Sequence, residues 1–297
     1  MKDWDAIARK NGFRAATLPV FRLKDVARRI RDFAQQNELN GFQNWIVNEM
    51  YQFTPPDEAC QSVLIVAVPF ALWANVRFAL DGRTYELRCP VSADMAKARR
   101  MVEENASRIW DAGALPFKRI AVHSGLAKYG RNNVTYVDGL GSAVSYWCWY
   151  LDEPCTDSWT DDILAPVCSG CGKCIQACPT GAIRPDRFLI DNLRCLSCHN
   201  ESPAPLPDWL PADVHHTLYD CLRCQENCPM NRGILAEDGG EFTEEETRKL
   251  LGGDDIDTFS EPTQERLRHL GIDQWYAAIA RNLQLLIAQK KKGGETA

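Results

Sequence analysis

The sequence predicts an α+β protein of about two domains, and three observations lead to this prediction. The chain has 297 residues, whereas an average domain has roughly 150. Strand-like and helical segments alternate over the part of the chain that ends near Thr160. Nine of the 13 cysteines then lie between Cys168 and Cys228, and this change in cysteine density marks a domain boundary.

The N-terminal part contains one clear strand candidate and two helix candidates. Residues 23–37 have helical spacing, and residues 62–69 form a β-branched run suited to a buried strand. Ser92 is a candidate N-cap for a helix that extends to about Trp110. These segments predict an α+β or α/β layer. The glycines that follow either let the backbone approach a flat ligand closely or form ordinary tight turns; they are Gly125, Gly130, Gly139 and Gly141.

The charge and hydropathy of the chain disfavour several classes of protein. The formal net charge is −6, which disfavours a generic nucleic-acid binder. Residues 1–6 lack the basic and apolar regions of a signal peptide, so we expect a cytoplasmic protein. The longest apolar run, residues 63–74, is shorter than the roughly 20 residues that cross a bilayer. We therefore expect no membrane span.

The first cysteine cluster has the spacing of a bacterial ferredoxin. It reads Cys168-Ser-Gly-Cys171-Gly-Lys-Cys174-Ile-Gln-Ala-Cys178-Pro179, a run in which the fourth cysteine ligates the other cluster. A structural zinc site is the alternative, because Cys-x₂-Cys pairs also bind zinc. The Cys-x₃-Cys-Pro ending, which occurs twice in the chain, favours two [4Fe–4S] clusters.

A second set of cysteines completes the ligands for two clusters. Cys195 and Cys198 are followed by Cys221-Leu-Arg-Cys224-Gln-Glu-Asn-Cys228-Pro229. By the ferredoxin exchange rule, the ligands of one cluster are Cys168, Cys171, Cys174 and Cys228. Those of the other are Cys178, Cys221, Cys224 and either Cys195 or Cys198. The proline-rich residues 202–211 between the halves predict an extended surface insertion.

The residues outside the cysteine region suggest a larger redox protein. A long segment, residues 1–160, precedes the clusters, so we expect the clusters to deliver electrons to a second redox centre. No Gly-x-Gly-x-x-Gly follows a strand, so a Rossmann site has little support. Near the C-terminus, helical spacing predicts a docking helix with a solvated lysine-rich end; its apolar positions are Trp275, Ile279, Leu283 and Leu286, and its basic ones Lys290, Lys291 and Lys292.

Several motifs together resemble the epoxyqueuosine reductase family over roughly residues 60–235. The ferredoxin part occurs in many proteins, whereas its combination with the other elements is more specific. The motifs are Ala121-Val-His-Ser124-Gly125-Leu126-Ala127-Lys128-Tyr129-Gly130-Arg131-Asn132-Asn133, Gly141-Ser142, the Cys168 motif with its continuation Pro179-Thr180-Gly181-Ala182-Ile183, Arg194-Cys195-Leu196-Ser197, and Cys221-x-x-Cys224-x₃-Cys228-Pro229-x-Asn231.

The resemblance implies a fold and a set of cofactors. The expected parts are a nitroreductase-like α/β domain for cobalamin and substrate (1–160), a bacterial-type two-cluster ferredoxin domain (161–235) and a short C-terminal helical segment (236–297). The family is also related to reductive dehalogenases. The Arg-Cys-x-Ser match favours Cys195 over Cys198 as the ligand. The residues expected to bind cobalamin are Ser124, Gly125, Leu126, Gly130, Arg131, Asn132, Gly141 and Ser142.

The resemblance also implies a mechanism with an acidic residue. The clusters would reduce the cobalt to a nucleophilic low-valent state, while an aspartate protonates the departing oxygen. Asp111 stands upstream of Gly125, at an offset that matches the position of that aspartate in the family. A helix cap or a solvated charge is the alternative role of Asp111. His123 is a candidate axial ligand or an ordinary packing residue, and Cys148 is expected to be a small buried hydrophobe.

Two departures from the family bear on the substrate. Gly125-Leu126-Ala127-Lys128 replaces the family's Gly-Leu-Gly-Trp, and only the short segment 236–297 follows Leu235, where the family continues into a helical-repeat domain that helps to hold the tRNA anticodon arm. This segment carries eight Lys and Arg against 13 Asp and Glu, whereas phosphate binding needs the opposite sign. These features make tRNA a doubtful substrate.

We therefore expect a cytoplasmic oxidoreductase that contains two [4Fe–4S] clusters and, by resemblance, cobalamin. Its substrate would be a small molecule or a modified nucleoside, and its electrons would come from an external low-potential donor such as a ferredoxin or flavodoxin. The alternative is an electron-transfer or corrinoid-binding iron–sulfur protein without substrate chemistry of its own. A third possibility is a pocket that has lost cobalamin, given the altered glycine loop.

Overall fold

The computed structural model describes residues 1–231 and 236–294, and these residues form two compact units. Unit 1 contains residues 1–69, 94–130 and 134–169. Unit 2 contains residues 70–93, 131–133 and the described residues from Gly170 onward. The domain boundary expected at residue 235 lies outside the described residues.

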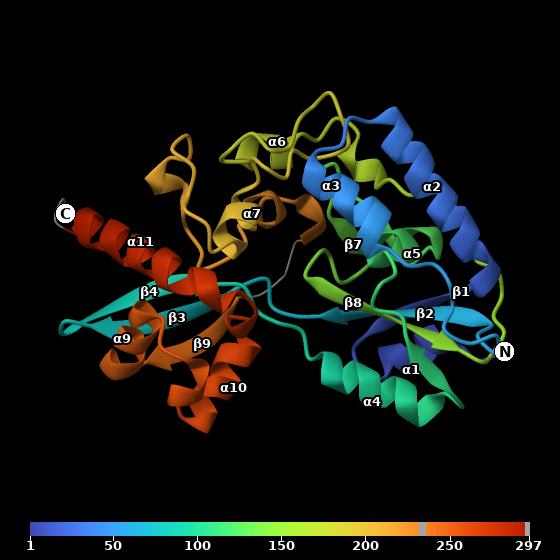
Figure 1. Ribbon diagram of the computed structural model, residues 1–297, viewed down its shortest axis with the longest axis horizontal. Coiled ribbons are helices and arrows are strands. Elements are labelled where there is room, and N and C mark those ends of the chain that lie inside the picture. Colours follow the sequence, from blue (N-terminus) through green and yellow to red (C-terminus); the bar gives the residue numbers. More distant parts are fainter. Residues whose placement is uncertain (232–235, 295–297) are drawn as a thin grey trace. The chain divides into compact units, whose positions relative to one another are not determined.

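Unit 1 is built around a four-stranded antiparallel sheet with the strand order β1-β2-β8-β5. Figure 1 shows helices on both faces of this sheet. β2 is buried from Ser62 through Val68, and burial on both faces explains why this segment is an uninterrupted apolar run. The strand predicted over residues 62–69 is therefore confirmed. The four strands are β1 (Arg14–Pro19), β2 (Ser62–Pro69), β5 (Ile109–Asp111) and β8 (Val144–Leu151).

The helices of unit 1 cover the sheet from two sides. α1 (Trp4–Arg9) and α4 (Met95–Asn105) lie on one face, and α2 (Leu23–Gln36) and α5 (Phe117–His123) lie on the other (Figure 1). The helix predicted from residue 23 is thus confirmed as α2. Unit 1 also contains α3 (Gly41–Trp45), a π-helical turn (Ile46–Met50), two 3₁₀ turns (Val20–Arg22 and Pro166–Cys168) and a small hairpin of β6 (Ala127–Tyr129) and β7 (Thr135–Val137).

The helix expected to begin after Ser92 starts later and ends earlier than predicted. Its N-cap is Asp94, whose carboxylate accepts the N–H of Lys97 at 3.0 Å. Ser92 cannot fill that role because it lies outside the first turn, where its own N–H donates to the His269 carbonyl at 2.9 Å. Trp110, the expected end of the helix, lies in β5.

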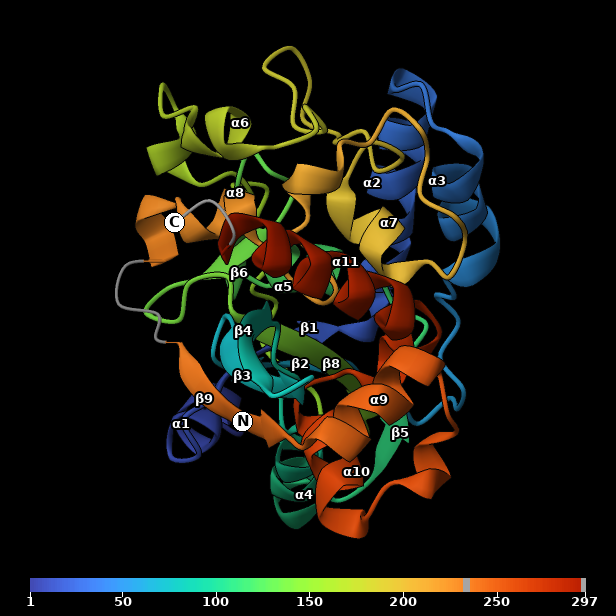
Figure 2. The same ribbon diagram turned by 90° about the vertical axis from the view of Figure 1, so that its left-hand side faces the viewer.

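Unit 2 contains a three-stranded sheet with the order β4-β3-β9. β3 (Ala74–Leu80) and β4 (Arg83–Cys89) form an antiparallel hairpin, whereas β9 (Glu237–Phe242) pairs with β3 in parallel. The hairpin turns at Asp81 and Gly82, which have φ angles of 52° and 70°, as an Asp-Gly two-residue turn requires. Helices α9 (Glu244–Gly252), α10 (Glu261–His269) and α11 (Tyr276–Gly294) share a core with this sheet (Figure 2).

The hairpin of residues 70–93 revises the expected division of the chain. The sequence placed it in an N-terminal domain of residues 1–160, but its side chains belong to the core of unit 2. Phe78 of β3 and Phe242 of β9 are fully buried and stack with their ring centroids 5.1 Å apart. The C-terminal segment is also not purely helical, because it supplies β9. A parallel pair joins residues far apart in sequence, so local patterns do not reveal it.

The cysteine-rich part of unit 2 has only short helices. Residues 202–211 contain neither helix nor strand and are largely exposed, in agreement with the expected insertion. Within the part of the chain that the structure describes, every helix is too short or too polar to span a bilayer. The short helices are α6 (Lys173–Ala177), α7 (Leu196–Glu201) and α8 (Arg223–Glu226).

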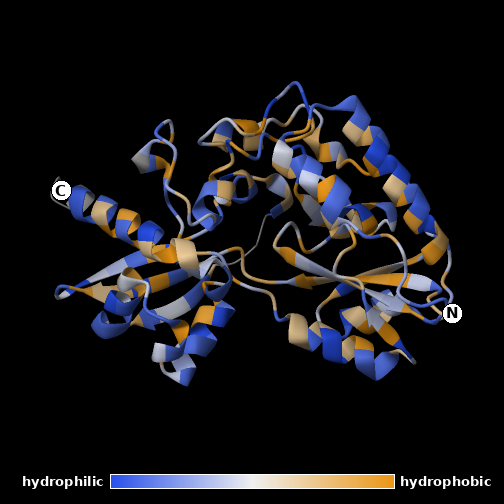
Figure 3. Ribbon diagram, viewed as in Figure 1, coloured by the Kyte–Doolittle hydropathy of each residue, from blue (hydrophilic) through white to orange (hydrophobic). Residues whose placement is uncertain are grey.

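The expected docking helix is α11, except that Trp275 lies in the 3₁₀ turn (Asp273–Trp275) that precedes it. Its residues Ile279, Leu283 and Leu286 are buried in the core of unit 2. Figure 3 shows the resulting alternation of hydrophobic and hydrophilic residues along this helix. Lys290 and Lys292 near its end are exposed, as predicted for a solvated helix end. Lys291 differs, because it pairs with Asp81 at 3.4 Å and lies over the Tyr85 ring.

Gly239 provides a test of the β3–β9 pairing. A Cβ at this position would lie 2.5 Å from Val76 Cγ2 and 3.0 Å from Ala74 Cβ. We expect Gly239→Ala to destabilise unit 2 by about 1–3 kcal/mol because overpacking displaces the strand. In a thermal melt of the cluster-loaded protein, the melting temperature should fall by several degrees. Gly41→Ala is the control, since no atom lies within 4 Å of its Cβ position; equal melting temperatures for the two variants would contradict the pairing.

Candidate functional site

Four of the expected cluster ligands lie close together in unit 2. Burial raises the pKa of the Cys195, Cys221 and Cys224 thiols, that of Cys221 to about 12. Cys178 acts electrostatically on Cys195 and Cys221, and Cys195 acts on Cys221 and Cys224. The four thiols thus lie within range of one another's charge, and they are the residues that the sequence assigns to one cluster. Because iron binds thiolates, buried thiols of this kind release protons when a cluster assembles.

Contacts around Cys195 distinguish it from Cys198. The Ser197 N–H donates a hydrogen bond to the Cys195 sulfur, and the Ser197 hydroxyl lies within hydrogen-bonding reach of the same sulfur. Burial and the charge of Glu201 raise the pKa of the Cys198 thiol. For Cys195, one of the groups that raise the pKa is the thiol of Cys178, which is another expected ligand. These contacts favour Cys195 as the ligand, which is the choice that the Arg-Cys-x-Ser match implies.

A strained turn presents Cys221 to this group. Asp220 and Leu222, on either side of it, have φ angles of 54° and 61°, a region that residues with a Cβ rarely adopt. The Asp220 carboxylate offsets part of this strain, because its Oδ1 accepts the Cys221 N–H at 2.7 Å and also the Ser197 hydroxyl. One carboxylate thus connects the Cys221 turn to the helix that begins after Cys195.

A buried amide pair holds the same turn against the C-terminal helix. The Asn200 side-chain amide donates to the Asp220 carbonyl at 2.8 Å. The Asn282 side-chain amide donates to the carbonyls of Asn200 and Leu218, each at 2.7 Å. Asn200 and Asn282 are fully buried, and satisfied polar groups in such an environment rigidify their surroundings. Helix α11 therefore supports the loop that carries Cys221.

The other expected ligand set crosses the division between the units. Cys168 ends a 3₁₀ turn (Pro166–Cys168) in unit 1, whereas Cys171, Cys174 and Cys228 belong to unit 2. Among the residues that the structure describes, no three His, Cys, Asp or Glu side chains converge as in a single-ion site. A cubane, in contrast to a zinc ion, binds its four ligands at four separate irons.

The eight residues expected to bind cobalamin are divided between the units. Arg131 and Asn132 belong to unit 2, where the Arg131 guanidinium donates to the Pro185 carbonyl at 3.4 Å and the Asn132 side chain donates to the Cys224 thiol. Asn132 therefore contacts an expected cluster ligand. The other six are in unit 1; they are Ser124, Gly125, Leu126, Gly130, Gly141 and Ser142.

Most of the unit 1 members of this set are buried, and Gly125 is exposed. The Ser124 hydroxyl donates to the Ala121 carbonyl at 3.1 Å at the end of α5. Gly125 has a φ angle of 77°, and no atom lies within 4 Å of the position that a Cβ would take. Gly125 thus leaves its backbone open to the approach of a flat ligand.

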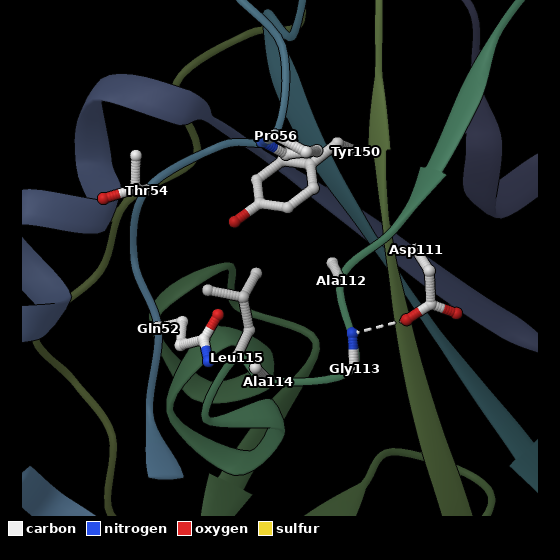
Figure 4. Close-up of a pocket in the computed structure, with 9 residues that line it drawn as sticks. All are labelled: Gln52, Thr54, Pro56, Asp111, Ala112, Gly113, Ala114, Leu115 and Tyr150. Atoms are coloured by element: carbon white, nitrogen blue, oxygen red, sulfur yellow. Dashed lines mark hydrogen bonds between the residues drawn. The ribbon is translucent and has the colours of Figure 1, made fainter. Parts of the chain in front are cut away.

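Asp111 lines a pocket of about 240 Å³ in unit 1 (Figure 4). It is exposed at the end of β5, where its Oδ1 accepts the Gly113 N–H at 2.7 Å and its Oδ2 accepts the Trp147 indole N–H at 3.1 Å. Asp111 is therefore not a helix cap. The other residues around the pocket are Gln52, Thr54, Pro56, Ala112, Gly113, Ala114, Leu115 and Tyr150.

Sequence reasoning missed the partners of Asp111. A Cβ on Gly113 would lie 2.9 Å from Asp111 Oδ1 and 3.3 Å from Trp147 Cζ2, so this position is tight for any residue other than glycine. Trp147 and Tyr150 both come from β8, and burial raises the pKa of Tyr150 to about 12, which keeps its hydroxyl protonated. The aromatic run 146–150 was the available signal, because buried Trp and Tyr need partners for their polar atoms.

His123 and Cys148 are core residues of unit 1. The His123 ring stacks on Trp159 with centroids 4.2 Å apart, and its Nδ1 lies 2.9 Å from the Thr160 carbonyl oxygen. Burial lowers the pKa of His123, and only 2% of the residue is exposed. A side chain in this position presents no nitrogen at the protein surface, which argues against the axial-ligand hypothesis. Cys148 is fully buried, as expected for a small hydrophobe.

Comparison with known proteins supports the iron–sulfur assignment. Residues 167–231 match the family model of the 4Fe-4S double cluster binding domain. The chain is 32% identical over 141 residues to the epoxyqueuosine reductase of Staphylococcus aureus. This matched stretch covers 47% of this chain and 36% of that protein. The chain is also 32% identical over 126 residues to the Bacillus subtilis enzyme, covering 41% and 31%. The matched stretch thus spans about a third of these relatives, and the predicted resemblance is confirmed.

Solved structures show the same fold over most of the chain. The epoxyqueuosine reductase of Streptococcus thermophilus matches with a TM-score of 0.63 at 16% identity, covering 95% of this chain and 79% of that one. The Bacillus subtilis enzyme, solved with its catalytic aspartate loop swung out of the active site, matches with a TM-score of 0.62 at 19% identity, with the same coverage. The predicted α+β fold class with a ferredoxin-like double-cluster domain is therefore confirmed.

A third solved structure with the same fold contains an RNA. An epoxyqueuosine reductase bound to an epoxyqueuosine-modified tRNA stem loop matches with a TM-score of 0.60 at 19% identity, covering 93% of this chain and 77% of that one. At this identity the match shows that the two chains share a fold.

The ligand choice between Cys195 and Cys198 can be tested directly. We expect Cys195→Ser to lower the iron content from about eight to about four per chain, because one cubane loses a ligand. Cys198→Ser should retain about eight. The measurement is iron analysis of anaerobically reconstituted protein, with electron paramagnetic resonance of the reduced form. The reverse pattern would assign the ligand to Cys198.

Proposed function

We propose that the protein is an iron–sulfur oxidoreductase that reduces epoxyqueuosine in a tRNA stem loop, with cobalamin as a further cofactor. The observation that carries this proposal is the combination of an exposed pocket aspartate, Asp111, with a double-cluster module in one chain. The proposed reaction is the one for which the similar proteins are named, and the chain matches these proteins over part of their length.

The clusters would supply the electrons for this reaction. Removal of an epoxide oxygen as water, with formation of a carbon–carbon double bond, consumes two electrons and two protons. Each [4Fe–4S] cluster passes one electron at a time, so two clusters together can hold what one turnover consumes. Ser197 and Asn132 donate hydrogen bonds to the sulfurs of Cys195 and Cys224. Hydrogen bonds of this kind are one means by which proteins set cluster potentials.

Asp111 is the residue that we propose as the proton donor to the departing oxygen. General acid catalysis requires a carboxyl group that reaches the substrate and has a defined orientation. The exposed position of Asp111 at the pocket meets the first requirement, and the hydrogen bonds from Gly113 and Trp147 meet the second. Trp147 is then a positioning residue, because it acts on the reaction through Asp111.

Cobalamin enters the proposal through the resemblance, and Gly125 fits it. Bound cobalamin would supply a strongly nucleophilic low-valent cobalt. Gly125 would contact the cofactor through its backbone, since its surroundings are open. Ser124 and Leu126 are buried on either side of it and would fix the loop from the core of unit 1.

An exposed aromatic pair supports an RNA substrate. Phe42 and Trp45 of α3 are each 51% exposed, and their rings stack with centroids 6.1 Å apart. The segment that follows reaches the pocket, because the Gln52 N–H donates to the Ala114 carbonyl at 3.1 Å. Exposed aromatic rings bind unstacked bases at about 1–3 kcal/mol each without requiring positive charge. Such a surface suits a loop nucleotide whose modified base enters the pocket.

An electron-transfer protein without substrate chemistry is the second candidate. The contacts around the expected cluster ligands lie within unit 2. They support iron–sulfur clusters in either kind of protein and do not distinguish an electron-transfer protein from an enzyme. The two functions differ in the role of Asp111. In an electron-transfer protein this aspartate would be an ordinary surface charge.

Asp111→Asn tests the proposed chemistry. We expect the rate of product formation to fall by about 10²–10⁴-fold, because the amide cannot donate the proton. Product would be measured by mass spectrometry on an epoxyqueuosine-modified stem loop, under single-turnover conditions with chemically reduced, cobalamin-loaded protein. Reduction of the clusters by dithionite should remain unchanged.

Asp138→Asn is the matched control, since it removes an exposed carboxylate of unit 1 outside the pocket. Its turnover should equal that of the wild type. Turnover of Asp111→Asn at the wild-type rate would exclude Asp111 as the donor. A wild-type protein that reduces its clusters but converts neither the stem loop nor the free nucleoside would favour the electron-transfer function.

Trp147→Phe tests the positioning role. Phenylalanine can retain packing against Phe117, whose ring centroid lies 5.5 Å from that of Trp147, but it cannot donate to Asp111. One lost hydrogen bond to the neutral carboxyl group that donates the proton, worth about 0.5–1.5 kcal/mol, should lower the rate about 2- to 10-fold. In the Asp111→Asn background the same substitution should have no further effect, because Trp147 acts through Asp111. A further loss in that double variant would indicate a general structural role.

A further inference from the structure

A polar groove in the cysteine-rich part of unit 2 is not used by the proposed chemistry. It lies between α6 and α8 and has a volume of about 560 Å³. Two of its lining residues are cations and none is a carboxylate. The residues that line it are Lys173, Gln176, Ala177, Arg223 and Asn227.

The groove lies beside the expected ligands of both clusters. Four of its five lining residues each directly precede a cysteine in the sequence, and the fifth, Gln176, lies between two of them. Two of these cysteines are expected to bind one cluster and two to bind the other. A molecule in the groove would therefore be close to both clusters, and electron transfer is fastest over short distances. The cysteines are Cys174 and Cys228 for one cluster and Cys178 and Cys224 for the other.

The two cations of the groove are available to a partner. Lys173 is exposed and takes part in no salt bridge within residues 1–231 and 236–294. Arg223 lies 3.4 Å from Glu226, but the Glu226 carboxylate also pairs with Arg88. Since one carboxylate is shared between two guanidinium groups, the local charge around Arg223 stays positive.

We propose that this groove is the docking site for an acidic one-electron carrier protein of the ferredoxin or flavodoxin class. The chain carries a net charge of −6, so an acidic protein is repelled by the molecule as a whole and attracted where cations are exposed. Transient electron-transfer complexes use small polar contact areas, which a groove of this size and composition suits. The inference rests on the proposed function in one respect, namely that the clusters receive electrons from an external protein.

Charge reversal in the groove tests this docking site. The variant is Lys173→Glu combined with Arg223→Glu, in cluster-loaded protein. Stopped-flow absorbance would follow reduction of the clusters by a reduced flavodoxin and, separately, by dithionite. We expect the second-order rate with flavodoxin to fall at least tenfold at low ionic strength and to depend less on salt. The rate with dithionite, a small reductant, should stay within twofold of the wild-type rate.

A matched control separates local from overall charge. Arg83→Glu combined with Arg268→Glu changes the net charge equally, and both residues are exposed in unit 2 outside the groove. This variant should accept electrons from flavodoxin within about twofold of the wild-type rate. Equal slowing of both variants, or no slowing of either, would overturn the docking site.

The proposed function can fail independently of the docking site. If the wild-type protein reduced its clusters with flavodoxin in a manner sensitive to Lys173 and Arg223, but left the stem loop unchanged, the docking site would stand and the proposed substrate would not. If both the stem-loop reaction and dithionite reduction were normal while the groove variant accepted electrons from flavodoxin as well as the wild type, the docking site alone would be wrong.

Discussion

The placement of Cys221 depends on a network of one half-buried carboxylate and two buried amides. Asp220 holds the strained Cys221 turn through its carboxylate, and Asn200 and Asn282 hold the same turn through backbone carbonyls. The thiolates that bind a cluster must occupy fixed positions around it. A flexible Cys221 loop would have to become ordered when the cluster assembles, and the conformational entropy lost would weaken cluster binding. Helix α11 thus helps to position an expected cluster ligand although it contains no cysteine itself. This explains in physical terms why the C-terminal segment is part of the same unit as the ferredoxin-like residues.

The predictable parts of the fold were those encoded by local patterns. β2 and α2 follow from a continuous apolar run and from helical spacing, and the cluster domain follows from cysteine spacing. The division of the chain could not be predicted in this way, because the parallel pairing of β3 with β9 joins Ala74 to Glu237, which are distant in sequence. One local signal was available: Asp81-Gly82 between alternating apolar residues is a strong hairpin signal. The helix cap at Ser92 failed because Asp94, two positions later, offers an equally good capping side chain in the register that the helix adopts.

For the candidate site as well, the sequence predicted features that depend on local patterns and missed those that depend on tertiary contacts. The position of Asp111 was inferred from a sequence offset, and the structure places it at a pocket. Its partners Gly113 and Trp147 could not be inferred, because the indole comes from a strand that pairs with β5 only in the folded sheet. Asn132 was assigned to cobalamin from a motif, whereas its side chain donates to Cys224. A motif preserves residues that act together, but it does not state which cofactor each of them contacts.

The net charge of the chain was the main argument against an RNA substrate, but in the structure several of the acidic groups are paired with cations. Acidic residues of the C-terminal segment have structural partners in unit 2: Asp238 pairs with Arg77 at 3.0 Å, and Glu244 and Asp81 both pair with Arg248. Glu246 completes the capping box of α9. The Asp111 pocket is made entirely of unit 1 residues, and unit 1 carries 16 Lys and Arg against 18 Asp and Glu. Charge summed over a chain therefore says little about the potential at one pocket, because directly paired cations neutralise acidic groups locally and salt screens those further away. A nearly neutral surface with exposed aromatic rings can bind a loop nucleotide by stacking, with the phosphates left in solvent.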